Sequence, residues 1–354
     1  MVRSRRRFLS QLGLAGLGLT FTGLAGCHRR HAGRALNLYT WDTYIGKHTL
    51  ADFTKATGAG VNVSLFANND ELFAKLRNGN QGYDVIIPSN DFVERMIAAD
   101  LLGAIDHEKI PNLANIMPQF MHVPYDPGRR YSVPYTWLVT GIGYRKSKVD
   151  GVPDSWKWVL DSDRYKGRIA LLAEAGELFE LGGKYLGHSI NDSSPALIAR
   201  VKQMLMKQKP NVAAFHDDNG QDMLLAGDVD IVIEYNGDIA QVMREDADLG
   251  FVVPREGSTI TSDNLCIPAG APNPDLAHEY INFVLEAHHA ADIFRTIRYP
   301  TPNQAALALM PGDYRDNPVI FPPAAALARC EYQRFRGQQV TAMYEAAMTQ
   351  LRAS

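Results

Sequence analysis

The chain has 354 residues, of which 46% are hydrophobic and 21% are charged, and this composition is typical of a folded globular protein. It excludes disordered, collagen-like and coiled-coil proteins. Lys and Arg number 36 against 39 Asp and Glu, giving a net charge of −3, and no basic stripe occurs beyond the first 34 residues. A nucleic-acid-binding surface is therefore not expected. A chain of this length usually forms two lobes rather than one core.

The first 26 residues have the pattern of an export signal. Four arginines without an acid precede an apolar, glycine-rich run that reaches Ala25. The segment Ser4-Arg-Arg-Arg-Phe-Leu9 resembles the twin-arginine export motif. A transmembrane anchor is the alternative, but the run is too short to span a bilayer and contains polar side chains. We therefore predict that residues 1–26 are a twin-arginine-type signal peptide.

The signal ends in Leu24-Ala-Gly-Cys27, which resembles the bacterial lipobox. We expect Cys27 to become the first mature residue and to carry a lipid that anchors the protein to a membrane. Residues 27–34 then form a short basic tether against lipid headgroups, with a metal-binding histidine pair as the alternative. Removing residues 1–26 takes away four arginines and no acid, which changes the net charge from −3 to −7.

Two cysteines, Cys266 and Cys330, remain once Cys27 is acylated, and two allow at most one disulfide. Twin-arginine substrates fold in the reducing cytosol before export. We therefore expect two buried free thiols, with a disulfide as the alternative.

From residue 35 onward, short apolar runs alternate with amphipathic stretches in a β-α-β-α-β-α pattern. The pattern predicts strands at 36–39, 61–65 and 84–87 and helices at 50–57, 70–78 and 92–102. Such alternation is typical of a parallel, doubly wound sheet.

The same pattern returns after residue 144, so a second sheet of the same kind is predicted. It consists of a strand at 169–172, helices at 178–186 and 195–207, and then alternating strands and helices at 212–215, 223–226, 230–235, 239–246 and 251–253. A short apolar run at 264–268 and helices at 274–285, 287–297 and 340–351 follow. No Gly/Ser linker separates the halves, which favours two lobes joined by ordered crossovers.

Common catalytic and nucleotide-binding motifs are absent from the mature sequence, including Gly-x-Gly-x-x-Gly after a strand, the P-loop, His-Glu-x-x-His and Gly-x-Ser-x-Gly. The ten histidines show no metal-ligand spacing. The segment Asp217-Asp-Asn-Gly220 superficially resembles a calcium loop, but Phe215 would be its first ligand, so we expect a turn that caps the next helix. We predict no metal, no cofactor and no enzymatic activity.

Five segments between about residues 36 and 333 resemble, in order, the spermidine/putrescine-binding proteins of polyamine ABC transporters. They are Leu38–Ile45, Tyr83–Ser89, Tyr131–Trp137, Pro210–Phe215 and Tyr299–Asn303. The resemblance implies a type II periplasmic-binding-protein fold, with two doubly wound α/β lobes, a hinge and a cleft that closes on an extended polyamine. It also implies a monomeric receptor in the periplasm or cell envelope that delivers its ligand to a permease.

We assign residues 35–138 and 264–310 to lobe 1 and residues 139–263 and 311–354 to lobe 2. A polyamine needs carboxylates for its ammonium groups and aromatic faces for its methylenes and charges. In open α/β sheets, ligands bind beyond the carboxyl ends of strands. Candidates at such places are Trp41 and Tyr44 after the first strand, Ser89 after the third, Tyr235 and Asp238 after the strand at 230–235, and Asp263 before the strand at 265.

The resemblance assigns a role to each candidate. It gives aromatic walls at Trp41, Tyr44 and Tyr235, polar contacts at Asp42 and Ser89, amine-binding carboxylates at Glu174, Glu177, Asp238 and Asp263, and late cleft contacts at Tyr299 and Gln333. Three positions depart from the family pattern, because Tyr235 replaces a tryptophan and Asp91 and Thr261 replace aromatic residues. Weaker cation–π contacts are expected there, offset by charge-assisted hydrogen bonds from the additional acids Asp42, Asp91 and Asp238.

Other interpretations stay open at this point. Trp41 and Tyr299 are also compatible with lobe packing, Asp238 and Asp263 with caps, and Glu174 and Glu177 with a solvated pair at a helix start. A receptor for another small solute would use the same fold, and an organic anion would need Arg298 or Arg334 at the cleft. An exported hydrolase would use Glu174 or Asp263 as an acid or base.

Overall fold

The computed structural model describes residues 34–353, so the predicted signal peptide, the lipidation site Cys27 and most of the predicted tether lie outside the described residues. The strands are β1 Ala35–Thr40, β2 Gly60–Leu65, β3 Val85–Ile86, β4 Val133–Arg145, β5 Ile169–Leu172, β6 Val212–His216, β7 Ile231–Tyr235, β8 Leu249–Val252, β9 Thr259–Leu265 and β10 Glu331–Tyr332. The α-helices are α1 Thr49–Thr57, α2 Asn69–Arg77, α3 Asn90–Ala98, α4 Lys157–Leu160, α5 Ala175–Tyr185, α6 Pro195–Gln208, α7 Gly220–Ala226, α8 Asn236–Val242, α9 Pro274–Val284, α10 Ala287–Ile297, α11 Gln304–Ala308, α12 Gly312–Arg315, α13 Ala324–Leu327 and α14 Gln338–Ala353. Short 3-10 helices are η1 His107–Lys109, η2 Pro111–Asn115, η3 Pro118–Phe120, η4 Pro127–Arg129 and η5 Lys209–Asn211.

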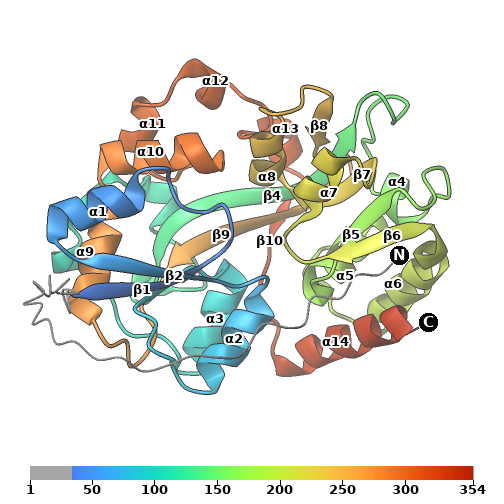
Figure 1. Cartoon of the computed structure of the whole chain (residues 1–354). Helices are drawn as coiled ribbons and strands as arrows, with labels where there is room; N and C mark the ends of the chain where they lie inside the picture. Colours follow the sequence, from blue (N-terminus) through green and yellow to red (C-terminus); the bar gives the residue numbers. More distant parts are fainter. Residues whose placement is uncertain (1–33, 354) are drawn as a thin grey trace, which may run out of the picture. The chain divides into compact units, whose positions relative to one another are not determined.

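The first sheet has the order β2-β1-β3, and all its strands are parallel, as predicted. Leu36 and Leu38 of β1 are fully buried, together with Phe53 of α1. This sheet and helices α1, α2 and α3 occupy the blue to cyan part of Figure 1. The carboxyl end of β1 leads directly into the loop that carries Trp41.

The second sheet is mixed, so the prediction of a second parallel sheet was wrong. Its order is β10-β9-β4-β7-β5-β6, and β8 also pairs with β4. β5 runs parallel to β6 and β7, whereas β4 runs antiparallel to β7, β8 and β9. Strand β4 was not predicted at all. Its side chains are almost continuously buried, so it lacks the alternation by which a half-buried strand is recognised.

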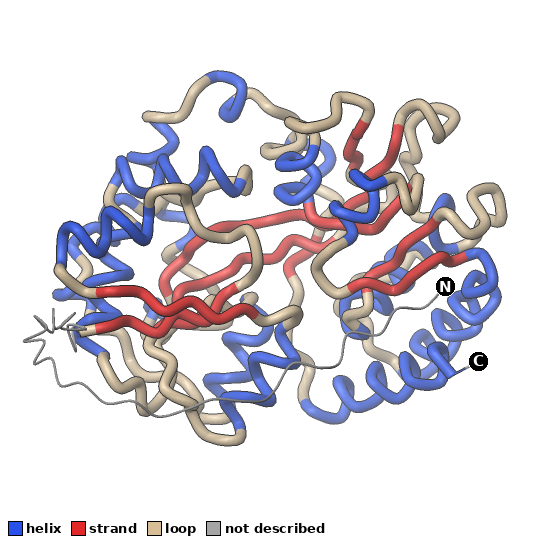
Figure 2. Tube along the Cα trace, viewed as in Figure 1, coloured by secondary structure: helices blue, strands red, loops and turns tan. Residues whose placement is uncertain are grey.

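The long strands β4 and β9 connect the two predicted lobes. The predicted lobe boundaries at 138/139 and 263/264 fall inside these two strands, which are seen as long neighbouring red tubes in Figure 2. β9 also approaches the first sheet through the isolated bridges Ile86↔Cys266 and Ser89↔Asp263. The second bridge places the start of α3 beside the middle of β9.

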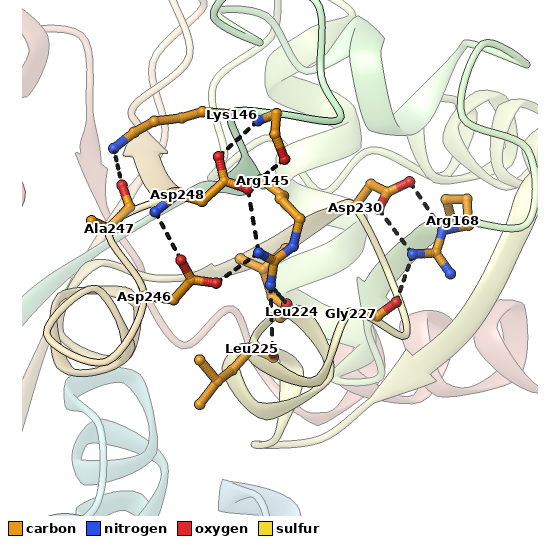
Figure 3. Close-up of polar contacts among 11 residues, drawn as sticks. Arg145, Lys146, Arg168, Leu224, Leu225, Gly227, Asp230, Asp246, Ala247 and Asp248 are labelled. Atoms are coloured by element: carbon orange, nitrogen blue, oxygen red, sulfur yellow. Dashed lines mark hydrogen bonds and ion pairs between the residues drawn. The ribbon is translucent and has the colours of Figure 1, made fainter.

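Ion pairs fix the loops at the end of the second sheet where β7 begins (Figure 3). Arg145, the last residue of β4, donates hydrogen bonds to Asp246 at 2.7 Å and Asp248 at 3.3 Å. Arg168 pairs with Asp230 at 2.9 Å, just before β7. Tyr235 ends the same strand, so these contacts lie at the opposite end of β7 from the predicted cleft residue.

Cys266 and Cys330 are both free thiols, as predicted. Cys266 is buried, but Cys330 is half-exposed, so its predicted burial was wrong. Cys330 lies in the surface turn between α13 and β10, next to the exposed Arg329. Within residues 34–353, no helix has an apolar stretch long enough to cross a bilayer.

Candidate ligand-binding site

A cavity of about 430 Å³ gathers all the side chains that were predicted for the cleft except Asp91. Its lining consists of Trp41, Asp42, Tyr44, Asn69, Ser89, Leu138, Glu174, Glu177, Asp218, Tyr235, Asp238, Thr261, Asp263, Tyr299 and Gln333. The lining side chains come from both predicted lobes and from the strands β4 and β9 between them. Residues that are up to about 290 positions apart in the sequence therefore meet in one place.

Asp263 receives two hydrogen bonds from residues of the first sheet's loops. The Tyr44 hydroxyl donates to one carboxylate oxygen at 2.5 Å, and the Ser89 hydroxyl donates to the other at 2.7 Å. Asn69 in turn donates to the Ser89 hydroxyl at 3.0 Å. Asp263 lies within β9 rather than before a strand, which corrects its predicted position. The bridge between Ser89 and Asp263 explains why these side chains meet.

Asp238 is held by Tyr299 at another wall of the cavity. The Tyr299 hydroxyl donates a 2.5 Å hydrogen bond to Asp238 Oδ2, and the amide of Gln241 donates to Oδ1 at 3.3 Å. No side chain caps the start of α8, so the alternative interpretation of Asp238 as a helix cap is wrong. Its buried carboxylate points into the cavity instead.

Glu177, in the first turn of α5, accepts hydrogen bonds from three hydroxyl groups. Tyr235 donates at 2.9 Å and Thr259 also at 2.9 Å, and Thr140 is the third donor. Glu177 is 3% exposed, so a solvated helix-start pair with Glu174 is ruled out. The hydroxyl donors come from β4, β7 and β9, which fixes α5 to the second sheet.

Aromatic rings form the remaining walls of the cavity. The Trp41 indole N–H donates to the Ile87 carbonyl at 2.8 Å, which orients the ring. The Tyr44 and Tyr299 rings meet edge to face with centroids 5.2 Å apart. Both rings are also part of the buried core, so packing and cavity lining are roles that these two residues combine.

The sequence did not identify Asn69, Leu138 or Asp218 as lining residues, and it treated Thr261 only as a departure from the family pattern. Asp218 was predicted to belong to a turn that caps the next helix, but α7 has no side-chain cap and Asp218 faces the cavity. It follows β6, whose carboxyl end lies beside that of the parallel strand β5. An acidic residue directly after a strand is the sequence feature by which Asp218 could have been identified.

The cavity is strongly acidic, because six of the described residues that line it are Asp or Glu and none of them is Lys, Arg or His. None of these six carboxylates forms an ion pair with any residue between 34 and 353. Burial raises the pKa of Asp263 to about 6, against the opposing hydrogen bonds from Tyr44 and Ser89. Burial and repulsion from Asp263 raise the pKa of Asp238 to about 7, although the Tyr299 hydrogen bond lowers it.

Burial also raises the pKa of Glu174 well above its ordinary value, and repulsion from Glu177 adds to this effect. A positively charged guest would relieve the repulsion among these acids. Their arrangement therefore suits a ligand with more than one positive charge.

The arginines that an anion-binding cleft would need lie elsewhere. Arg298 pairs with Asp313, and Arg334 lies 3.6 Å from Glu94. Arg334 lines a neighbouring cavity of about 530 Å³, where Asp91 also lies. The additional acid Asp91 is therefore outside the main cavity, although the two cavities share Glu174, Glu177 and Gln333.

Comparisons with known proteins identify the family of this chain. The family model described as bacterial extracellular solute-binding protein matches residues 48–322. The chain belongs to this family. It is 33% identical over 326 residues to the putrescine/cadaverine-binding protein of Pseudomonas aeruginosa, covering 88% of this chain and 92% of the relative. It is 32% identical over 346 residues to the spermidine/putrescine-binding periplasmic protein of Escherichia coli, covering 96% of this chain and 97% of the relative.

Solved structures show the same fold. A spermidine/putrescine ABC transporter protein of Listeria monocytogenes superimposes with a TM-score of 0.86 at 30% identity, covering 90% of this chain and 99% of that chain. A lipoprotein of Treponema pallidum superimposes with a TM-score of 0.78 at 28% identity, covering 90% of this chain and all of that chain (100%). The predicted resemblance to the spermidine/putrescine-binding proteins and the type II periplasmic-binding-protein fold are therefore confirmed. So is the prediction of a binding protein rather than an enzyme.

Proposed function

We propose that this protein captures a polyamine, putrescine or spermidine, and delivers it to the membrane permease of an ABC transporter. The observation that carries the proposal is a cavity whose lining, within residues 34–353, has six acids, aromatic walls and no basic side chain. Carboxylates bind ammonium groups through charge-assisted hydrogen bonds, and aromatic faces cover methylenes and attract cations. The names of the P. aeruginosa and E. coli relatives support the same class of ligand.

The acids of the cavity bind the ammonium groups of the ligand, and the aromatic rings enclose its alkyl chain. Asp263 and Asp238, each already oriented by a tyrosine hydroxyl, bind ammonium groups, and Glu174 and Glu177 bind ammonium at the α5 side of the cavity. Trp41, Tyr44, Tyr235 and Tyr299 enclose the alkyl chain, and Asp42, Ser89 and Gln333 complete the polar lining. Binding involves no covalent step and no cofactor.

The two lobes are proposed to move about β4 and β9. Lobe 1 comprises residues 35–138 and 264–310, and lobe 2 comprises residues 139–263 and 311–354. Two of the three boundaries, 138/139 and 263/264, fall within these strands, and the third, 310/311, lies between α11 and α12. Small backbone changes in the two strands would open the cavity without breaking either lobe. We propose that the receptor acts as a monomer.

Export and anchoring are the second part of the proposal. Residues 1–26 serve as a twin-arginine-type signal peptide, and Cys27 carries the lipid that holds the mature protein in the periplasm or cell envelope. The relative of T. pallidum, which is a lipoprotein, supports this assignment. Metabolic labelling with a radioactive fatty acid tests it. The wild-type protein should be labelled and Cys27→Ser should not, whereas equal labelling of both would refute lipidation at Cys27.

Isothermal titration calorimetry with a matched set of ligands tests the binding function. Putrescine and spermidine should bind, n-butylamine should bind far more weakly because it lacks one charge, and glutarate should not bind. Binding of glutarate without binding of either polyamine would show that the ligand is an anion and that the proposal is wrong. Native mass spectrometry of the purified protein gives an independent check, because a co-purified ligand adds its own mass.

A further inference from the structure

Glu234 and His216 meet in the protein interior directly behind the cavity. Glu234 precedes Tyr235 in β7, and because successive strand residues point to opposite faces, Tyr235 lines the cavity whereas Glu234 does not. Glu234 is fully buried and His216, the last residue of β6, is 3% exposed. His216 Nδ1 lies 3.8 Å from Glu234 Oε2, and neither atom has a hydrogen-bond partner among the described residues.

Gly220, the first residue of α7, lies in direct contact with this pair and has no side chain to displace it. A Cβ atom on Gly220 would lie 2.4 Å from Glu234 Oε2 and 2.5 Å from His216 Cε1. Such distances are far below van der Waals contact, so any other residue at this position would displace both side chains. The absence of a side chain at Gly220 therefore allows the acid and the imidazole to face each other against the start of α7.

The other contacts of the two side chains fix which atoms carry protons. His216 Nε2 lies 3.1 Å from the Ile233 carbonyl, which can only accept, so Nε2 carries the hydrogen and Nδ1 presents a lone pair. Glu234 Oε1 accepts the Tyr235 backbone N–H at 2.9 Å. A proton on Oε2 would thus point toward the lone pair on Nδ1. Burial supports this state, because it raises the pKa of Glu234 well above its ordinary value and lowers the pKa of His216 to about 4.

The charges that face Glu234 are acids of the cavity. Asp238 in α8, Asp218 before α7 and Glu177 in α5 all repel a negative charge on Glu234, and Asp217 faces His216. These acids disfavour ionisation of Glu234 as long as they are not neutralised. A cation bound between Asp218 and Asp238 would neutralise that repulsion and attract the Glu234 carboxylate as well.

We propose that Glu234 is a positioning residue that holds a proton toward His216 when the cavity has no ligand and releases it when a diammonium ligand binds. The O–H bond of the Glu234 carboxyl group breaks, the proton passes to solvent, and the protein gains one negative charge opposite the incoming cation. This inference rests on the proposed function, because it names a residue behind the same cavity that adjusts the charge of the site to its ligand.

The variant Glu234→Gln tests the inference, since its amide oxygen can still accept from the Tyr235 backbone N–H and its amide group cannot release a proton. Calorimetry with putrescine should give wild-type affinity at about pH 5.5 and about tenfold weaker binding at about pH 8, because one unit of pKa shift is a tenfold effect. Titrations in two buffers of different ionisation enthalpy should show about one fewer proton released per ligand. The control Asp230→Asn makes the same acid-to-amide change at the far end of β7, where Asp230 pairs with Arg168 (Figure 3), and should keep the wild-type pH profile.

A second measurement uses the wild-type protein alone, in case the variant does not fold. At about pH 8.5 the acids whose pKa lies near 6 or 7 are ionised. Putrescine should then remove a protonated-carboxyl band from the infrared difference spectrum, as release of the Glu234 proton requires. An unchanged band, or identical pH profiles of Glu234→Gln and wild type, would overturn the inference while leaving polyamine binding intact. Failure of the wild type to bind putrescine or spermidine at any pH would instead overturn the proposed function, and this inference with it.

Discussion

The Tyr299 ring lies directly on the backbone of Gly237, and its hydroxyl donates a 2.5 Å hydrogen bond to Asp238, the next residue. A Cβ atom at position 237 would be 2.3 Å from the nearest ring carbon. The absence of a side chain at 237 is thus what allows a residue after α10 to orient an acid at the start of α8. This pair joins segments 61 positions apart in the sequence.

The substitution Gly237→Ala should therefore weaken ligand binding and lower stability. Displacing Tyr299 from a packed position costs about 1 to 3 kcal/mol, and Asp238 would lose its orienting donor. Thermal unfolding and calorimetry with putrescine would measure both effects. Gly60→Ala is the matched control, because no atom lies within 4 Å of its added methyl group, and it should leave both quantities unchanged. Equal behaviour of the two variants would refute the role of Gly237.

Asp263→Asn should weaken polyamine binding by about 1.5 to 3 kcal/mol, because a hydrogen bond to a charged group is replaced by one to a neutral amide. An anionic ligand would bind more tightly to the same variant. The exposed Asp275, which pairs with Lys109 and does not line the cavity, provides the control Asp275→Asn with no expected change in affinity. Calorimetry with putrescine distinguishes these results, and an unchanged affinity of Asp263→Asn would exclude Asp263 from the binding site.

Polyamine affinity should rise with pH between about 5 and 8. Asp263 and Asp238 have pKa values raised to about 6 and about 7, so both are protonated in mildly acidic solution. A neutral carboxyl group binds an ammonium group more weakly than a carboxylate does. Ionisation of one acid that contacts the ligand changes the affinity by at most about tenfold per pH unit. A flat affinity profile across this range would show that these acids do not contact the ligand.

The stability of the ligand-free protein should change with pH in the opposite direction. The unfolded chain loses the proton of Asp263 near its ordinary pKa of 3.8, whereas the folded protein keeps it until about pH 6. The unfolded state therefore binds fewer protons between these values, and the free energy of unfolding falls as pH rises, by at most about 3 kcal/mol for this group. Denaturant unfolding at several pH values between about 4 and 6 checks this, and saturating putrescine should oppose the fall because it binds the ionised carboxylate.

Glu177→Gln should lower stability as well as affinity. The two carboxylate oxygens accept from Tyr235, Thr259 and Thr140, whereas glutamine offers one oxygen and places an amide against the remaining hydroxyls. A lost buried acceptor costs about 1 to 3 kcal/mol. Glu279→Gln removes only an exposed ion pair with Arg34 and should unfold like the wild type. If both variants unfold alike, the three hydroxyl contacts contribute nothing to stability.

Much of the fold was predictable, because its helices and outer strands follow simple periodic patterns. The helix at 287–297 and the strand at 169–172 were predicted with the observed bounds. Strand β4 was not predicted, because burial on both faces removes the alternation of apolar and polar residues. It also contains Pro134, Gly141 and Gly143, which are residue types that disfavour a strand. The antiparallel course of β4 in the second sheet depends on contacts with β8 and β9, far away in the sequence, which no local pattern reports.

The site was more predictable than the sheet that carries it, since strand ends indicated six of its side chains and the family resemblance indicated these and five more. Asp218 was missed because its sequence context, Asp217-Asp218-Asn219-Gly220, is that of an ordinary turn. Its position in the cavity depends on where α7 begins, and Gly220 at that point was not informative on its own. Cys330 was predicted to be buried from residue type alone, but the turn after α13 leaves it half-exposed.

The six carboxylates of the cavity have no cationic partner among residues 34–353, and we expect a small amine from the medium to supply counter-charge to those that are ionised. Any small amine therefore competes with the natural ligand, including common laboratory reagents such as Tris and ammonium salts. Affinities measured in phosphate or HEPES should exceed those measured in Tris at equal pH and ionic strength. Choice of buffer is thus part of the binding equilibrium for this receptor.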